Sequence, residues 1–406
     1  MHGISRRRRS FGNAFAQTVG FLGVRYHLIT DTYKRRDNLD KHIKKLTAAA
    51  VLAVMAVNVI STAVGGKKAD PSAPKATASA FYDGSFSREV SEYASEHMAL
   101  RDKMLSFQAK MAEKFGGRIV NGVYIGKDRL LDAEMSERIP DPSAADRINA
   151  FARKFDGTVY IAVIPTSSGV YGETMPDYLL GNPESQQISD LYDSLDSSIR
   201  RIDAYNILKM LKDNYIYFRN DTKWTSYGAY CIYRTVIQKL GFLPITYDKY
   251  TIRHVTDEFR GNLYDRTLYA DTLADILDIY EYRDGAEVES CTAVYKNGLV
   301  HEINFYDMDM LESGDMYGMY LGKPEAVIEI ETSVNNQKRL LVIKDSYADC
   351  FIPFLTQHYS RITVVSPEYM DGSLKDRIDT SEYEQTLILF GIENAGNSAL
   401  FSGIAQ

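Results

Sequence analysis

Four short runs of apolar, mostly β-branched residues constrain the fold of this chain more than any other feature. They are TVYIAVIP (158–165), RLLVIKDS (339–346), RITVVS (361–366) and QTLILFG (385–391). Two longer segments, 185–211 and 228–242, have the apolar spacing of helices. Continuous apolar strands alternating with helices predict an α/β fold with a parallel sheet covered on both faces. In such sheets, ligands bind beyond the carboxyl ends of the strands.

The charged residues divide the chain into a basic head and an acidic body. Residues 1–45 contain 11 Lys and Arg against three Asp, whereas the remainder contains 36 against 51 Asp and Glu. This division predicts two compartments rather than one folded unit with a basic face. The 406 residues are 45% hydrophobic and 25% charged, which is ordinary for a protein with a full core.

A segment without charge separates the head from the body. Residues 46–64 provide 19 residues, about the length of a membrane-spanning helix, with Lys41, Lys44 and Lys45 on one flank. The positive-inside rule predicts a single-pass membrane protein with a cytoplasmic head (1–45) and an extracytoplasmic C-terminal part. A cleaved signal peptide and a buried core helix are the alternatives. The long segment before the apolar stretch favours an uncleaved anchor.

The flanking segments fit a membrane anchor. Residues 65–80 are rich in Pro, Ala, Ser and Lys and predict a flexible linker, which places the folded domain at 81–406. The Arg6–Arg9 run is expected to face anionic lipid beside the bilayer rather than nucleic acid.

No cofactor or metal is predicted. The sequence lacks a glycine-rich phosphate loop, HExxH and G-x-S-x-G, and its three cysteines are scattered. Cys231, Cys291 and Cys350 are expected to be small buried hydrophobes, although one disulfide pair stays open.

Ser346 follows an apolar strand directly, where hydrolases often place a nucleophile. The same residue could begin a capping box with Asp349, which needs no chemistry and is the commoner reason for such a pattern. A second polar group is Asp221-Thr222-Lys223-Trp224. Taken alone, it predicts an Asx turn at Asp221, a solvated lysine, a core tryptophan and a helix capped by Thr225 or Ser226.

The two groups together resemble a known family. NDTKWTSYGAY (220–230) and LLVIKDSYADCFIPFLTQHYSRI (340–362) are similar, in this order, to the signature blocks of the DHHW family. Supporting likeness spans about residues 81–391. The resemblance implies a flavodoxin-like SGNH-hydrolase fold related to bacterial alginate acetyltransferases, which are extracytoplasmic proteins that use Ser, His and Asp on acetyl esters of cell-surface polysaccharide.

The resemblance also implies roles for individual residues. Ser346 matches the nucleophile and Asp221 the acid that orients the base, but Lys223 stands where the family has its catalytic histidine. The residues expected to contact a ligand are Trp224, Tyr347, Gly322, Lys323 and Glu368. Gly322-Lys323 replaces a usual Gly-Asn, and Glu368 replaces an arginine of Asp-Pro-Arg-Tyr, so several presumed pocket positions are altered.

Lysine is a poor replacement for the histidine. A serine hydroxyl needs a base that is largely neutral near pH 7. Lowering a lysine pKa from about 10.4 to 7 costs roughly 4.6 kcal/mol, and a nearby Asp221 opposes that shift. Lys223 is therefore expected to be protonated. Of the histidines at 97, 254, 301 and 358, His254 is the substitute base worth testing, and His358 is expected to pack at a helix end.

Three functional hypotheses follow. The first is a catalytically impaired SGNH-like protein, not itself an enzyme, that binds cell-surface polysaccharide or assists a membrane acyltransferase. The second is an active O-acetyltransferase or acetylesterase that uses Ser346 with Lys223 or a displaced histidine. The third is a structural scaffold of the cell envelope. The altered pocket positions favour the first.

Overall fold

The computed structural model of the chain describes residues 101–134 and 140–405. The predicted cytoplasmic segment, membrane span and linker, and the first 20 residues of the predicted domain, lie outside this part. No helix of the described part is long and apolar enough to cross a membrane. Residues 104–406 form one compact unit.

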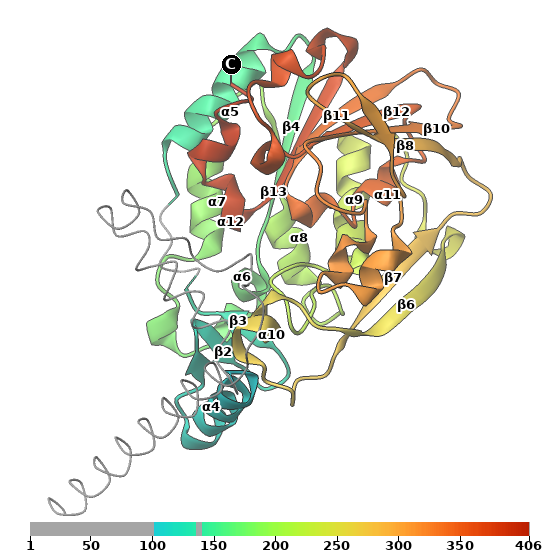
Figure 1. Cartoon of the computed structure of the whole chain (residues 1–406). Coiled ribbons are helices and arrows are strands. Elements are labelled where there is room, and N and C mark those ends of the chain that lie inside the picture. Colours follow the sequence, from blue (N-terminus) through green and yellow to red (C-terminus); the bar gives the residue numbers. More distant parts are fainter. Residues whose placement is uncertain (1–100, 135–139, 406) are drawn as a thin grey trace, which may run out of the picture. The chain divides into compact units, whose positions relative to one another are not determined.

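An eight-stranded sheet is the centre of this unit (Figure 1). Its first five strands run parallel to their neighbours, whereas the last three are antiparallel. In sheet order, the strands are β5 (Arg200–Ile202), β4 (Thr158–Ile164), β13 (Gln385–Gly391), β11 (Arg339–Lys344), β12 (Arg361–Val365), β10 (Val327–Thr332), β8 (Val288–Val294) and β9 (Val300–Glu302).

The mixed sheet corrects the prediction of a purely parallel one. The four apolar runs became β4, β11, β12 and β13, the centre of the parallel part. The antiparallel strands β10 and β8 expose part of one face, so VIEIET alternates buried and half-buried residues. Half-solvated antiparallel strands carry such alternation, in contrast to the continuous apolar runs of buried parallel strands.

Helices cover both faces of the parallel part, as predicted. On one face, Ile161 and Val163 of β4 belong to a core that includes residues of α5 and α7. On the other, Tyr160 and Ala162 belong to a core that includes residues of α8, α9 and α11. These helices are α5 (Ser143–Lys154), α7 (Glu184–Asp193), α8 (Ala204–Met210), α9 (Ser226–Lys239) and α11 (Ile352–Leu355).

The predicted helix at 185–211 is two helices separated by the edge strand β5. Tyr192 at the end of α7 fixes this break, because its hydroxyl donates to the carbonyl of Ile202 and accepts from the amide of Val163. The second predicted helix is α9, which begins at Ser226 and ends at Lys239. The Thr225 side chain caps it by accepting from the amide of Gly228.

Two small sheets and several short helices complete the described part. The small sheets are β1 (Ile119–Val120), β2 (Val123–Ile125) and β3 (Leu130–Asp132), and the pair β6 (Thr251–Phe259) and β7 (Asp275–Glu281). The remaining α-helices are α4 (Arg101–Phe115), α6 (Ser167–Tyr171), α10 (Asn262–Thr267) and α12 (Ile392–Ala395). Short 3₁₀ turns include Met316–Met319, Ser346–Ala348 and Pro367–Tyr369.

Candidate functional site

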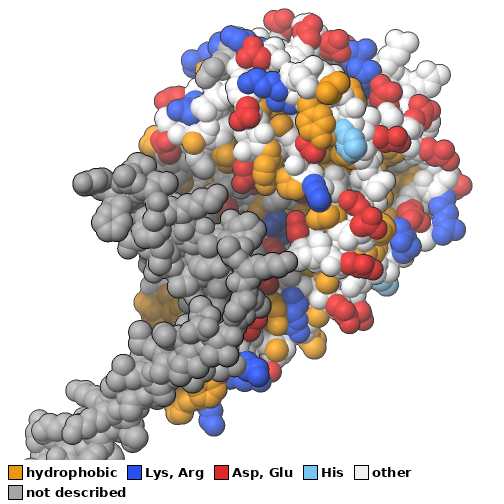
Figure 2. Space-filling model, viewed as in Figure 1, with side chains coloured by type: hydrophobic (Ala, Val, Ile, Leu, Met, Phe, Trp, Pro, Cys, Tyr) orange, Lys and Arg blue, Asp and Glu red, His pale blue; other side chains and the backbone are white. Residues whose placement is uncertain are grey.

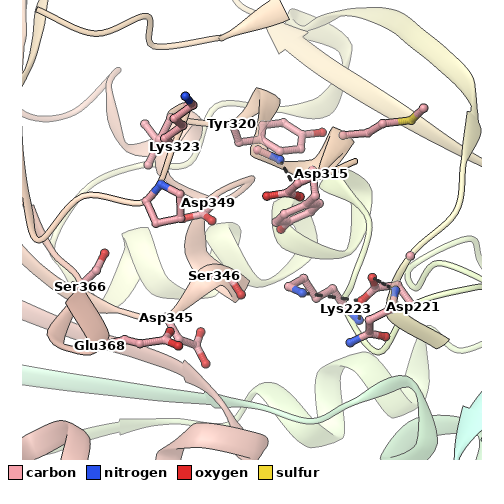
Figure 3. Close-up of a pocket in the computed structure, with 18 of the residues that line it drawn as sticks. Asp221, Lys223, Asp315, Tyr320, Lys323, Asp345, Ser346, Asp349, Ser366 and Glu368 are labelled. Atoms are coloured by element: carbon pink, nitrogen blue, oxygen red, sulfur yellow. Dashed lines mark hydrogen bonds and ion pairs between the residues drawn. The ribbon is translucent and has the colours of Figure 1, made fainter. Parts of the chain in front are cut away.

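A pocket of about 380 Å³ lies where β11 ends (Figure 3). Its wall combines chain segments that are far apart in sequence, which the sheet brings together at this edge. The lining comes from residues 221 and 223, 259–262 and 265, 314–318 and 320–325, residue 328, 344–346 and 349, and residues 366, 368 and 369. The site therefore occupies the position at which α/β sheets commonly bind ligands.

Ser346 lies in this wall with an exposed side chain. It opens the 3₁₀ turn that follows β11, but the capping group is the preceding residue, Asp345, whose carboxylate accepts from the Tyr347 amide at 3.0 Å. The capping-box interpretation is wrong, because Asp349 instead pairs with Lys344. Within the described residues, the Ser346 hydroxyl makes no hydrogen bond. The turn thus presents this hydroxyl to the pocket without using it structurally.

Asp345 is held by three donors below the serine. Besides the Tyr347 amide, it accepts from the Gly391 amide at 2.9 Å and the Asn394 side chain at 3.1 Å. Burial nevertheless raises the pKa of Asp345 to about 7, against the lowering effect of these hydrogen bonds. The carboxyl therefore titrates near neutral pH at the base of the candidate site.

Asp221 is buried and forms the predicted Asx turn. Its Oδ1 accepts from the Lys223 amide at 2.9 Å, and its Oδ2 accepts from the Asn262 amide at 3.0 Å. Gly261 is required beside it, because a Cβ at this position would lie 2.0 Å from Oδ2 of Asp221. The segment FRGNLY (259–264) can therefore pack against the Asp221 carboxylate only because residue 261 is a glycine.

Lys223 extends its ammonium into the pocket from the same turn. Nζ lies 3.8 Å from Oδ1 of Asp221, and 5.3 Å and 6.0 Å from the ring centres of Tyr317 and Tyr347. The side chain is largely buried, so it is not the solvated lysine that the local sequence alone predicts.

The surroundings of Lys223 keep it charged. Burial favours the neutral amine, but the carboxylate of Asp221, followed by Glu393, Asp345 and Asp349, outweighs burial and raises the pKa of Lys223. Figure 3 shows the Lys223 ammonium and the Ser346 hydroxyl pointing toward each other across the pocket, and no hydrogen bond joins them. A protonated amine in this position can donate a proton but cannot accept one from serine.

No histidine of the described part lines the pocket. His358 is buried in the core, where its Nε2 lies 2.7 Å from the Tyr233 hydroxyl, and burial lowers its pKa to about 4. His254 pairs with Asp278 on the small sheet of β6 and β7, and His301 lies on β9. His97 lies outside the described residues. Among the described residues, the displaced-base alternative therefore finds no histidine at this site.

Trp224 and Tyr347 correct the expected set of ligand-contacting residues. Both side chains are buried, and neither lines the pocket. The indole N–H of Trp224 donates to the Tyr347 carbonyl at 2.7 Å, and its ring stacks on Phe351. The single proton of the Tyr347 hydroxyl is shared between the Thr222 carbonyl at 3.1 Å and Glu393 at 3.0 Å. Through these contacts, the two aromatic side chains connect the segment 220–230 with the segment 340–362 beneath the pocket.

The other three predicted contacts do line the pocket. Gly322, Lys323 and Glu368 belong to its wall, together with Ser366 and Tyr369 of the SPEY segment. Lys323 and Glu368 have exposed side chains, so both charges face solvent at the mouth. The structure therefore brings Ser346, Asp221 and Lys223 together with three of the five expected contacts, while their roles stay predictions.

The sequence reading missed a buried ion pair in the same wall. Lys344, the last residue of β11, contacts Asp349 with only 9% and 14% of the two side chains exposed. The sequence does contain an indication of this pair: Lys344 ends an otherwise apolar strand, and a lysine buried there needs an acidic partner. Together with Lys223 and Asp221, this pair places two neutralised lysines on the pocket wall.

A metal site is not evident in the part of the chain that the structure covers. There, no three His, Cys, Asp or Glu residues are arranged to hold a metal ion. All three cysteines are free; Cys291 and Cys350 are buried, and Cys231 is half-buried.

Comparisons with known proteins identify the family of this chain. The family model described as DHHW protein matches residues 139–365. No functionally curated protein matches the chain by sequence.

Among solved structures, a DHHW family protein from Eubacterium siraeum is similar at 20% identity, covering 70% of this chain and 95% of that one, with a TM-score of 0.59. PatB1 of Bacillus cereus is similar at 20% identity, with 69% and 99% coverage and a TM-score of 0.55. The same protein with a sulfonyl adduct gives 18% identity, 68% and 97% coverage, and a TM-score of 0.56. These likenesses show a shared mixed α/β fold. Because the family match spans more than half of its residues, the chain belongs to the DHHW protein family.

Proposed function

We propose that this protein is a DHHW family member that binds cell-surface polysaccharide without turning it over. Its pocket is the size of a small-ligand site and carries many polar side chains, which suits recognition of hydroxyl groups. In cells, the protein would be held at the membrane by residues 46–64 and would assist a membrane acyltransferase that acts on the same polysaccharide.

One observation carries this proposal: Lys223, at the position where the family has its histidine, lies beside carboxylates that raise its pKa and so favour the protonated amine. General-base catalysis is worth about 10²- to 10⁴-fold in rate, and a serine without a base is a weak nucleophile at neutral pH. Because Asp221 and the neighbouring carboxylates raise the pKa of Lys223, the amine does not take up this role.

Active acyl transfer is the second candidate, and the exposed hydroxyl of Ser346 is the observation that favours it. A Ser346-dependent esterase would need neutral Lys223, which the surrounding carboxylates disfavour. A scaffold without any ligand is the third reading and predicts no glycan binding at all.

The test is hydrolysis of 4-nitrophenyl acetate by the full-length chain. Wild type and Ser346→Ala should give the same rate, whereas Lys223→His should gain about 10²-fold or more, because imidazole is a competent base near pH 7. The gain should vanish in Lys223→His/Ser346→Ala. Lys338→His, on an exposed lysine away from the pocket, controls for hydrolysis by any surface histidine. A wild-type rate that falls on Ser346→Ala would establish the active alternative.

A further inference from the structure

A second hollow of about 530 Å³ lies next to the candidate pocket. Both cavities are lined by Gly322, Lys323 and Glu325, so one loop forms a wall of each. The second hollow extends along the edge of the large sheet, where Tyr295, His301, Glu302, Asn304 and Asp307 line it. The loop is thus a wall shared by both hollows, called the ridge below, and the two hollows together are called the depression.

The ridge is held in a fixed shape. Leu321 and Gly322 both have left-handed backbone conformations, with φ of 67° and 74°. Such a conformation at a non-glycine residue costs on the order of 1–3 kcal/mol and persists only where the surroundings impose it. Here the Leu321 side chain is buried and its amide donates to the Phe305 carbonyl at 3.1 Å. The depression is therefore formed before any ligand arrives.

The lining of the second hollow suits a hydroxyl-rich chain. The Tyr295 side chain is 42% exposed, which leaves an aromatic surface for the apolar face of a ring to stack on. Asn304, His301 and Glu302 offer neighbouring hydrogen-bond donors and acceptors. A ligand long enough to cross the ridge would contact both hollows.

The charges along the depression restrict that chain further. Lys223 and Lys344 are neutralised by Asp221 and Asp349, which leaves Lys323 and Arg260 as the lining cations without a carboxylate partner in the described part. Carboxylates without a lysine or arginine partner in the described part line both hollows: Asp315, Glu368, Glu325, Glu302 and Asp307. Figure 2 shows acidic side chains spread among the basic ones over the visible face of the molecule. A negative wall repels carboxylate-bearing ligands.

We propose that the two hollows form one groove for a glycan chain without carboxylate groups, of a neutral or amine-bearing kind, several sugars long. This inference rests on the proposed glycan binding and names the class of glycan and its second contact region. The groove would thereby discriminate against polyuronates.

Calorimetric titration of the full-length chain in mild detergent tests the groove. The probes are the hexasaccharide and the disaccharide of N-acetylglucosamine and a mannuronate hexasaccharide. The neutral hexasaccharide should bind at least about tenfold tighter than the other two. Raising the salt from about 50 to about 500 mM should reduce the difference in affinity between the neutral hexasaccharide and the mannuronate hexasaccharide. The reason is that salt screens the repulsion between the carboxylates of mannuronate and those of the groove.

Tyr295→Ala should weaken hexasaccharide binding about three- to tenfold and leave disaccharide binding unchanged. Tyr178→Ala removes an aromatic side chain that is 75% exposed outside both hollows and should change nothing. Three results would each contradict the groove while leaving glycan binding intact. They are equal affinity for the hexasaccharide and the disaccharide, tighter binding of mannuronate, and no effect of Tyr295→Ala on hexasaccharide binding. Failure of every probe to bind would contradict the proposed function itself, and the groove with it.

Discussion

The indole N–H of Trp224 donates a 2.7 Å hydrogen bond to the main-chain carbonyl of Tyr347. The donor follows Lys223 directly and the acceptor follows Ser346, so this bond sets the spacing between the two pocket residues from the layer beneath them. Removing it should loosen the site without touching either side chain.

Trp224→Phe should lower the free energy of unfolding by about 1–3 kcal/mol for the unsatisfied buried carbonyl, with a further loss from the smaller ring. Urea denaturation at neutral pH measures this effect. Tyr178→Phe, which keeps its ring at a side chain that is 75% exposed, should change stability by less than about 0.5 kcal/mol. A Trp224→Phe protein as stable as the control would show that the bond is not a structural link.

Gly261 and Gly314 provide a matched pair of substitutions in the pocket wall. Gly261→Ala would place a methyl group 2.0 Å from Oδ2 of Asp221, whereas Gly314→Ala meets nothing within 4 Å. We expect Gly261→Ala to destabilise the fold by about 1–3 kcal/mol as Asp221 is displaced, and Gly314→Ala to be nearly neutral. Thermal unfolding of the two variants checks this, and equal melting temperatures would contradict the close approach.

Glu184 should give stability a measurable pH dependence. This buried carboxyl shares a short hydrogen bond of 2.5 Å with the Thr166 hydroxyl and accepts from the Thr166 amide. Burial raises its pKa from 4.5 to about 7. The folded state therefore holds the proton more tightly than the unfolded state, and stability is lost as the pH rises from about 4.5 to 7.

Glu184→Gln mimics the protonated form and should remove this dependence. Wild type and variant are expected to be similar near pH 4.5, with the variant gaining relative stability up to pH 7 and holding a constant advantage above it. Urea denaturation across this pH range is the measurement. In Glu173→Gln, the control, the wild-type carboxyl has a pKa lowered by its hydrogen bond to Lys212, so the variant should gain nothing. A constant difference between Glu184→Gln and wild type at every pH would refute the shift.

The sequence predicts the centre of this fold better than its edge. Each apolar run became a strand of the parallel part because strands buried on both faces must be apolar throughout. The strands β8 and β9 cannot be predicted from apolar runs, because β9 is exposed along its whole length and β8 is only partly buried. The break between α7 and α8 depends on the Tyr192 hydroxyl, a tertiary contact that no local pattern encodes.

At the site, the sequence identifies the residues that come together, but not which of them line the pocket and which are buried beneath it. Family resemblance brought Asp221, Lys223 and Ser346 together although the first and last are 125 positions apart. It also suggested Trp224 and Tyr347 as ligand contacts, whereas both are buried beneath the pocket. Whether an aromatic side chain lies in a wall or beneath it depends on how the chain turns after each strand, which composition and spacing do not reveal.

Asp345, rather than Ser346, stabilises the turn after β11. The serine could therefore be exchanged for alanine with little harm to folding, because its hydroxyl takes no part in this turn. The cavity therefore holds an exposed hydroxyl that the turn does not need, so a substitution confined to position 223 would change the chemistry of the pocket without any rebuilding of the scaffold that carries the serine.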